Sequence, residues 1–123
     1  MLVKFIDPLT QSNETRLNMI GKTYVVLSVE ITPDGRPNEL LIENSKGGTP
    51  GLFEFECFEI LDNRIPSKWV LEKSKPSNIS FTPEELAGDF WDRYYEDHPD
   101  TFEAIDTLKA AIKKIEAFHG IKN

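Results

Sequence analysis

The spacing of apolar side chains changes near residue 74 of this 123-residue chain. Before that point apolar residues recur at every second position, most clearly in residues 24–31, which is typical of β-strands with one buried face. After it they recur at every third or fourth position, which is typical of amphipathic helices. The order indicates an α+β fold. The length suits a single domain over 1–123, with a β-rich part at 1–73 and a helical part at 79–120 packed on it.

Strands are expected at residues 2–6, 24–31, 39–43, 52–58 and 58–61, and Trp69 introduces a further short strand. Alternation within 24–31 places two sets on opposite faces: Val25, Leu27, Val29 and Ile31 against Tyr24, Val26, Ser28 and Glu30. Alternation within 52–58 places Phe53, Phe55 and Cys57 on one side. Residues 8–21 are polar and turn-rich. Short strands at this spacing predict a small bent antiparallel sheet or a barrel.

Two helices are expected to follow the strands and form a C-terminal helical hairpin. Thr82 suits the N-cap of the first, and Pro83 suits its first turn. That helix would stack Leu86, Phe90 and Tyr94 on one face and end at residues 98–99. The second helix carries an apolar stripe, and Gly120 suits its C-cap. The members of the stripe are Phe102, Ile105, Leu108, Ile112 and Ile115.

Negative charge is concentrated in the helical part. The net charge of the chain is −7, but residues 84–106 alone carry nine acidic residues and only Arg93 as a basic one, which gives −8. The remainder of the chain is therefore almost neutral. Such a block repels a nucleic-acid backbone and attracts a basic protein. We therefore expect a basic protein partner and no nucleic acid.

Cys57 is the only cysteine, so no intramolecular disulfide and no multi-cysteine zinc site can form. Its apolar neighbours predict a small buried hydrophobic side chain, with a reactive thiol as the alternative. The N-terminal residues do not have the pattern of a secretion signal, and the longest apolar runs are too short to span a membrane. Together these features predict a cytoplasmic protein.

Motifs for catalysis are scarce. His119 is expected to serve the C-terminus of a helix. Asp97, His98 and Asp100 could in principle help to bind a metal, but residues so close in sequence cannot easily converge on one ion. No Gly-x-Ser-x-Gly motif is present, and residues 46–51 lack the spacing of a phosphate-binding loop. We therefore assign no catalytic residue, no metal ligand and no cofactor. An unrecognised hydrolase, with a cleft around His98 or Cys57, stays as an alternative.

The acidic block gives the best candidate site. Its carboxylates lie away from the expected apolar face, and the four aromatic residues at 90, 91, 94 and 95 cannot all point inward from one helix. Aromatic side chains surrounded by charge are common at the centre of protein interfaces. An ordinary solvated helix face is the alternative. The predicted partner-binding residues are Asp89, Trp91, Asp92, Tyr95, Glu96 and Asp97.

Three segments resemble the small SH3-like β-barrel modules that are frequent in bacterial and phage proteins. They are Ile6-Asp7, Ile20-Gly21-Lys22-Thr23-Tyr24-Val25-Val26-Leu27 and Phe58-Glu59-Ile60-Leu61-Asp62. The resemblance covers residues 2–62 and implies an SH3-like barrel for the N-terminal part. It implies nothing about activity.

Further segments resemble immunity proteins of bacterial polymorphic-toxin systems, including contact-dependent growth inhibition. They are Ile65-Pro66-Ser67-Lys68-Trp69, Thr82-Pro83-Glu84-Glu85-Leu86 and Phe90-Trp91-Asp92-Arg93-Tyr94-Tyr95-Glu96-Asp97. This resemblance implies a protein that binds and neutralises a cognate toxin by blocking its active site or substrate groove. The acidic block indicates a basic target such as a nuclease. An exposed strand edge could pair two chains, so a monomer or weak dimer is expected. The alternative is an SH3-like adaptor or regulatory module that binds through the loops at 33–38 and 45–51.

Overall fold

The structure is a computed structural model that describes residues 1–9, 13–66, 68–75, 78–95 and 101–121. Seven β-strands, three α-helices and two short 3-10 helices occur in this part of the chain. Their bounds are β1 Leu2–Phe5, α1 Glu14–Met19, β2 Thr23–Ile31, β3 Glu39–Ile42, β4 Gly51–Glu54, η1 Phe55–Cys57, β5 Phe58–Asp62, β6 Trp69–Lys75, β7 Asn78–Pro83, η2 Glu84–Leu86, α2 Phe90–Tyr95 and α3 Thr101–Phe118. None of the helices in the described ranges is long and apolar enough to cross a membrane.

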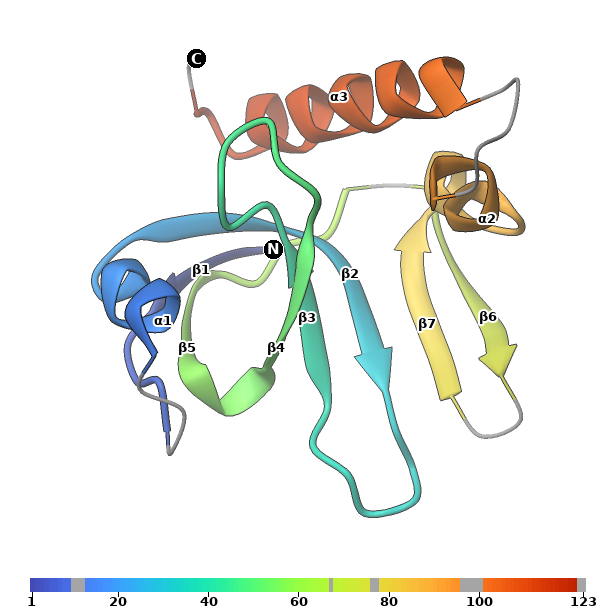
Figure 1. The fold of residues 1–123 in the computed structure, drawn as a ribbon. Helices are drawn as coiled ribbons and strands as arrows, with labels where there is room; N and C mark the ends of the chain where they lie inside the picture. The colour runs from blue at the N-terminus through green and yellow to red at the C-terminus, as the bar shows by residue number, and fades with distance from the viewer. Residues whose placement is uncertain (10–12, 67, 76–77, 96–100, 122–123) are drawn as a thin grey trace.

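The strands form one antiparallel sheet that bends around the long strand β2 (Figure 1). One edge of β2 pairs with β3, and its other edge pairs first with β1 and then with β7. Strands β4 and β5 lie at the two ends of the path β4-β3-β2-β1-β5, and β6 pairs with β7. The α+β class and the bent antiparallel sheet are thereby confirmed, and the sheet is open and not a closed barrel.

Each face of the bent sheet has its own hydrophobic core. Helix α3 lies across one face, where Leu27, Phe90 and Leu108 belong to one buried cluster. The concave side encloses the second cluster, which includes Phe5, Val26 and Cys57 and is completed by Met19 of α1. Figure 1 shows α3 above the sheet, α1 at the end near β5, and α2 at the opposite end beside β6 and β7.

A β-bulge in β2 changes which residues face α2. Val26 pairs with Ile42 but Ser28 pairs with Leu41, so β2 has one extra residue at this point. The expected alternation across residues 24–31 is therefore wrong beyond the bulge. Val29 packs with the concave cluster instead of beside Leu27. Ser28 and Glu30 turn instead to the face that η2 and α2 cover.

The first expected helix is broken into shorter elements. Pro83 does not begin a helix, because it lies at the end of β7 and pairs with Trp69 of β6. A single 3-10 turn follows, and Gly88 then adopts φ +68°, which interrupts any continuous helix before Phe90. The strands thus extend to Pro83, beyond the composition change near residue 74.

The expected alternation of side chains between the two faces also fails after β4. The 3-10 helix η1 replaces a continuous strand, so Phe55 is exposed whereas Phe53 and Cys57 are buried, which corrects the expected common side for these three residues. Residues 14–19, expected to be turn-rich, form helix α1 and bury Arg16. Its guanidinium Nη1 lies 2.9 Å from Glu54 Oε2 and 3.6 Å from Cys57 Sγ. The predicted burial of Cys57 is confirmed.

Helix α3 follows its apolar stripe only from its second turn. Leu108, Ile112 and Ile115 are buried, but Phe102 is 82% exposed, so its assignment to the buried stripe is wrong. Gly120, at φ +74°, ends the helix as predicted, because its N–H donates to the Ala117 carbonyl in a left-handed C-cap.

Candidate protein-binding site

The predicted partner-binding residues within the described ranges lie on or next to α2. Asp89 precedes the helix, and Trp91, Asp92 and Tyr95 belong to it. Asp89, Asp92 and Tyr95 are exposed, and Trp91 is half-buried. The other two predicted residues, Glu96 and Asp97, lie outside the described residues, as does His98. The structure therefore brings four of the six predicted side chains onto one short helix and the turn before it.

Four aromatic rings form a continuous cluster along α2. Phe90 is fully buried and packs edge-to-face on Trp91 with ring centroids 4.9 Å apart. Trp91 contacts Tyr94 at 5.3 Å and Tyr95 at 5.9 Å. Tyr95 is 62% exposed, so it is the residue of this cluster that reaches furthest into solvent. The rings support one another, and this support limits the conformational entropy that Tyr95 would lose on binding.

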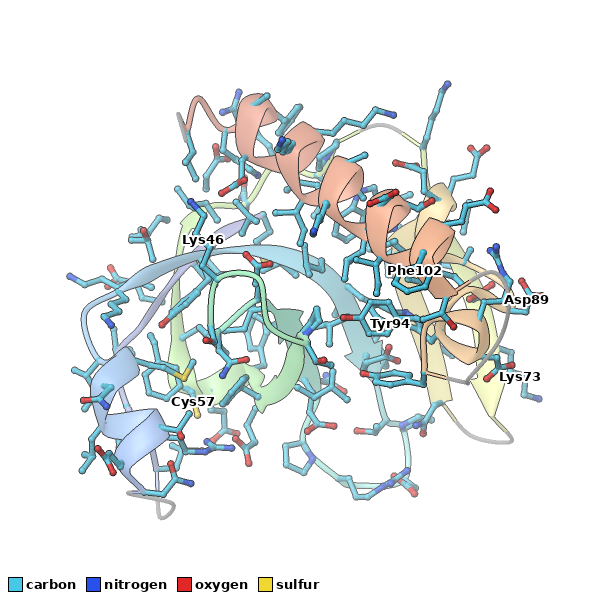
Figure 2. The ribbon with its side chains drawn as sticks, turned by 45° about the horizontal axis from the view of Figure 1, so that its top comes forward. Lys46, Cys57, Lys73, Asp89, Tyr94 and Phe102 are labelled. Atoms are coloured by element: carbon cyan, nitrogen blue, oxygen red, sulfur yellow. The ribbon has the colours of Figure 1, made fainter. Side chains whose placement is uncertain are left out.

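Charges around α2 are only partly compensated. Asp89 Oδ1 lies 3.3 Å from Arg93 Nε, and Glu85 Oε2 lies 3.7 Å from Lys114 Nζ. In each pair one side chain is 75% exposed, so the pair contributes little to stability. Asp92 makes no ion pair with the other described residues. Asp89 is 75% exposed at its side chain, and Figure 2 shows it at the outer side of α2. A negative surface therefore remains available to a basic partner.

A polar cleft opens beside this helix, and the bulge in β2 creates it. Three residues stand opposite one another across strands β2, β7 and β6, namely Glu30, Ser80 and Glu72. Ser80 Oγ donates to Glu30 Oε2 at 2.6 Å. The backbone N–H of Gly88 donates to both carboxylate oxygens of Glu72, at 3.1 and 3.0 Å. These bonds hold two carboxylates in fixed positions at the base of the turn that leads into α2.

The cleft has a volume of about 350 Å³. Trp91 and Asp92 of the predicted site line it, so the cleft and the exposed face of α2 form one continuous site, which we call the acidic cleft. Thr82 also lines the cleft and is 2% exposed, yet its hydroxyl has no hydrogen-bond partner within the described structure. The full lining is Ser28, Glu30, Glu72, Lys73, Ser80, Thr82, Leu86, Gly88, Trp91 and Asp92.

Electrostatics in the cleft favour a cation. Burial raises the pKa of Glu30, and the neighbouring carboxylates Glu39 and Glu72 raise it further, although hydrogen bonds from Ser80 and Ser28 oppose the shift. A positive group placed beside Glu30 would relieve this repulsion. Lys73 is the only basic residue in the lining against three carboxylates, and its exposed side chain is labelled at the β6 edge in Figure 2. The unpartnered Thr82 hydroxyl supplies a further acceptor.

Phe102 adds an apolar side chain that the sequence did not assign to the site. It lies in the first turn of α3, which packs against α2, and Thr101 Oγ1 donates to the Arg93 carbonyl at 3.2 Å. Figure 2 labels Phe102 on α3 and Tyr94 on α2, and these two helices pack against each other. The only sequence signal for Phe102 is its place as the first residue of the apolar stripe. A residue at the end of such a stripe can lie beyond the surface that the helix covers.

Within the described residues, Cys57 and His119 lie away from this site. Cys57 is fully buried at the end of the sheet remote from α2, and burial with the neighbouring Glu54 raises the pKa of its thiol to about 11. His119 is enclosed between Asp62 Oδ2 and the Met1 amino nitrogen, each 3.0 Å from one ring nitrogen. Among the described residues no group of three or more His, Cys, Asp or Glu side chains could hold a metal ion.

The chain matches no known protein family, no curated protein and no solved structure at a significant level. Functional assignment therefore depends on the geometry and charge of the acidic cleft.

Proposed function

We propose that this chain is an immunity protein, which binds a basic toxin domain through the acidic cleft and blocks its active site or substrate groove. The observation that carries the proposal is the cleft itself. It combines three carboxylates, an unpartnered buried hydroxyl and the ring of Trp91 in a space of about 350 Å³. A lysine or arginine side chain matches all of these features, because it can donate to the oxygens and lie against the indole ring.

The surroundings of the cleft suit a protein partner. Tyr95 and Phe102 are exposed aromatic side chains, and such residues supply most of the binding energy at protein interfaces. The carboxylates of Asp89 and Asp92 would speed association with a basic surface and exclude acidic partners. Many nucleases have a basic surface for their substrate, so carboxylates placed there would occupy the phosphate positions. In this role the chain binds its target in the cytoplasm and catalyses no reaction.

Affinity capture from the native host tests this proposal with three baits. The first is the unchanged chain. The second carries Asp92→Asn and Tyr95→Ala. The control carries Glu59→Gln and Leu61→Ala, which remove one exposed carboxylate and one exposed apolar side chain from β5. A basic protein should be retained by the unchanged and control baits and lost from the second. Retention of the same protein by all three would contradict the site.

Neutralisation is tested by expressing the basic domain of the captured protein. We expect it to stop growth in cells that lack this chain, and we expect co-expression to restore growth. A captured partner that cells tolerate would instead support the adaptor alternative, with binding that regulates and does not neutralise.

A further inference from the structure

A second groove lies on a different part of the molecule from the acidic cleft. It has a volume of about 720 Å³ and lies between α3, the start of β2 and the loop that joins β3 to β4. Figure 1 shows this loop rising from the sheet beside α3. The volume falls within the range of about 300–1,000 Å³ that is usual for small-molecule sites.

Positive charge collects around this groove although the chain as a whole is acidic. Four lysines line it, namely Lys22, Lys46, Lys109 and Lys113, against two glutamates, Glu43 and Glu116. All four lysine side chains are exposed, and Lys46 is labelled on its loop in Figure 2. We call this feature the lysine groove.

None of these four lysines makes an ion pair in the described part of the chain. The ion pairs found there use other cations, which are Arg16, Arg36, Arg64, Arg93, Lys114 and His119. Lys109 and Lys113 are four positions apart on α3, where like charges repel and destabilise a helix. Glu43 is engaged by its own loop, because its carboxylate accepts from the Gly47 N–H at 3.4 Å. An anion in the groove would relieve the repulsion among the lysines.

The floor of the groove is not charged. Tyr24 and Ile112 line it between the lysines, and the ring of Tyr24 is half-buried. The aliphatic stems of the lysines extend this apolar surface while their ammonium groups reach the rim. A ligand that fits would therefore combine negative charge with a flat group whose face can lie on this apolar surface.

We propose that the lysine groove binds a small phosphorylated molecule that also carries a flat aromatic ring system. Phosphate oxygens would accept hydrogen bonds from the ammonium groups of Lys109 and Lys113 on α3 and of Lys22 and Lys46 opposite. The ring system would lie against Tyr24 and Ile112. A long nucleic acid does not suit this place, because a net charge of −7 would repel a backbone that extends beyond the groove.

Nuclear magnetic resonance titration of the ¹⁵N-labelled chain tests this inference with three probes. ATP carries both the phosphates and an aromatic ring system, inorganic triphosphate carries only the charge, and adenosine carries the ring system and the ribose without phosphate. ATP should bind saturably and shift the amide signals of Gly21, Lys22 and Gly47. Each of the other two probes should bind at least about tenfold more weakly, since each loses one set of contacts.

Two matched variants locate the site. Lys109→Gln with Lys113→Gln should weaken ATP binding about tenfold or more. Lys68→Gln with Lys114→Gln removes the same charge from a different hollow, which Trp69 lines, and should leave the affinity within about twofold. Equal weakening in both variants, or shifts spread evenly over all lysines, would overturn the site. Equal affinity for ATP and triphosphate would overturn the role of the apolar floor.

Discussion

Replacing Glu54 with glutamine should lower the free energy of unfolding by about 3 kcal/mol, because it leaves the Arg16 guanidinium buried without its counter-charge. The two side chains are only 9% and 19% exposed, and their atoms are 2.9 Å apart. The cost falls at the lower end of the range for broken buried pairs because the glutamine oxygen still accepts a hydrogen bond. With a urea m-value of about 2 kcal/mol per molar, the unfolding midpoint should fall by about 1.5 M.

Two companion variants isolate the cause. Adding Arg16→Met to Glu54→Gln removes the stranded charge and should recover about 1–2 kcal/mol, since methionine can still pack on the Phe53 ring that the guanidinium now covers at 5.1 Å. Asp34→Asn breaks the exposed pair with Arg36 and should leave the midpoint unchanged. The reasoning is refuted if the double variant is no more stable than Glu54→Gln alone, or if that single change leaves the midpoint in place.

Three further outcomes follow from the burial and charge of single residues. Burial raises the pKa of Glu30 in the folded chain above its ordinary value of 4.5, so ionisation of this carboxyl lowers the stability as the pH rises above 4.5. The Glu30→Gln variant lacks this ionisation and should lose less stability than the unchanged chain between pH 4 and pH 7 in urea titrations. Phe90→Ala should cost about 3–5 kcal/mol by thermal or urea unfolding, whereas Phe102→Ala should leave stability unchanged and weaken only partner binding, because Phe102 is 82% exposed. Cys57, with its pKa raised to about 11, should resist iodoacetamide at pH 8 until urea unfolds the chain, and rapid labelling of the folded protein would contradict its burial.

Local patterns predicted most of the strands and the end of the last helix. The expected strands match β1, β2, β3 and β5 to within one or two residues, because each contributes at least one buried apolar side chain to one of the two cores. Gly120 marked the end of α3 because a left-handed C-cap is a local requirement. These features depend on neighbours in the sequence, so sequence is sufficient to find them.

Other features depend on residues that are distant in the sequence. The bulge in β2 arises where its pairing passes from β1 to β7 on one edge while β3 follows the other, and no local pattern records this. The sequence around Pro83 predicts the start of a helix, but Pro83 lies at the end of β7 and pairs with Trp69 of β6. Tertiary pairing overrides helix propensity at this point.

The acidic cleft was predicted only in part for the same reason. Asp92 and Trp91 were identified from their block of charge and aromatic residues, which is continuous in sequence. Glu30, Glu72 and Thr82 come from three different strands and converge only through the sheet register. The cleft lies against the helix that carries the predicted residues, but its shape depends on strand register that no local pattern records.

The most direct test of the acidic cleft is a titration of the ¹⁵N-labelled chain with a short arginine-containing peptide and with its citrulline counterpart, which has the same shape without the charge. A cation-binding cleft predicts saturable shifts of the Ser80 and Gly88 amides and of the Trp91 indole with the arginine peptide, weak shifts with citrulline, and loss of the effect in Asp92→Asn with Glu30→Gln. Equal responses to the two peptides, or shifts that avoid the residues of the cleft, would contradict the account.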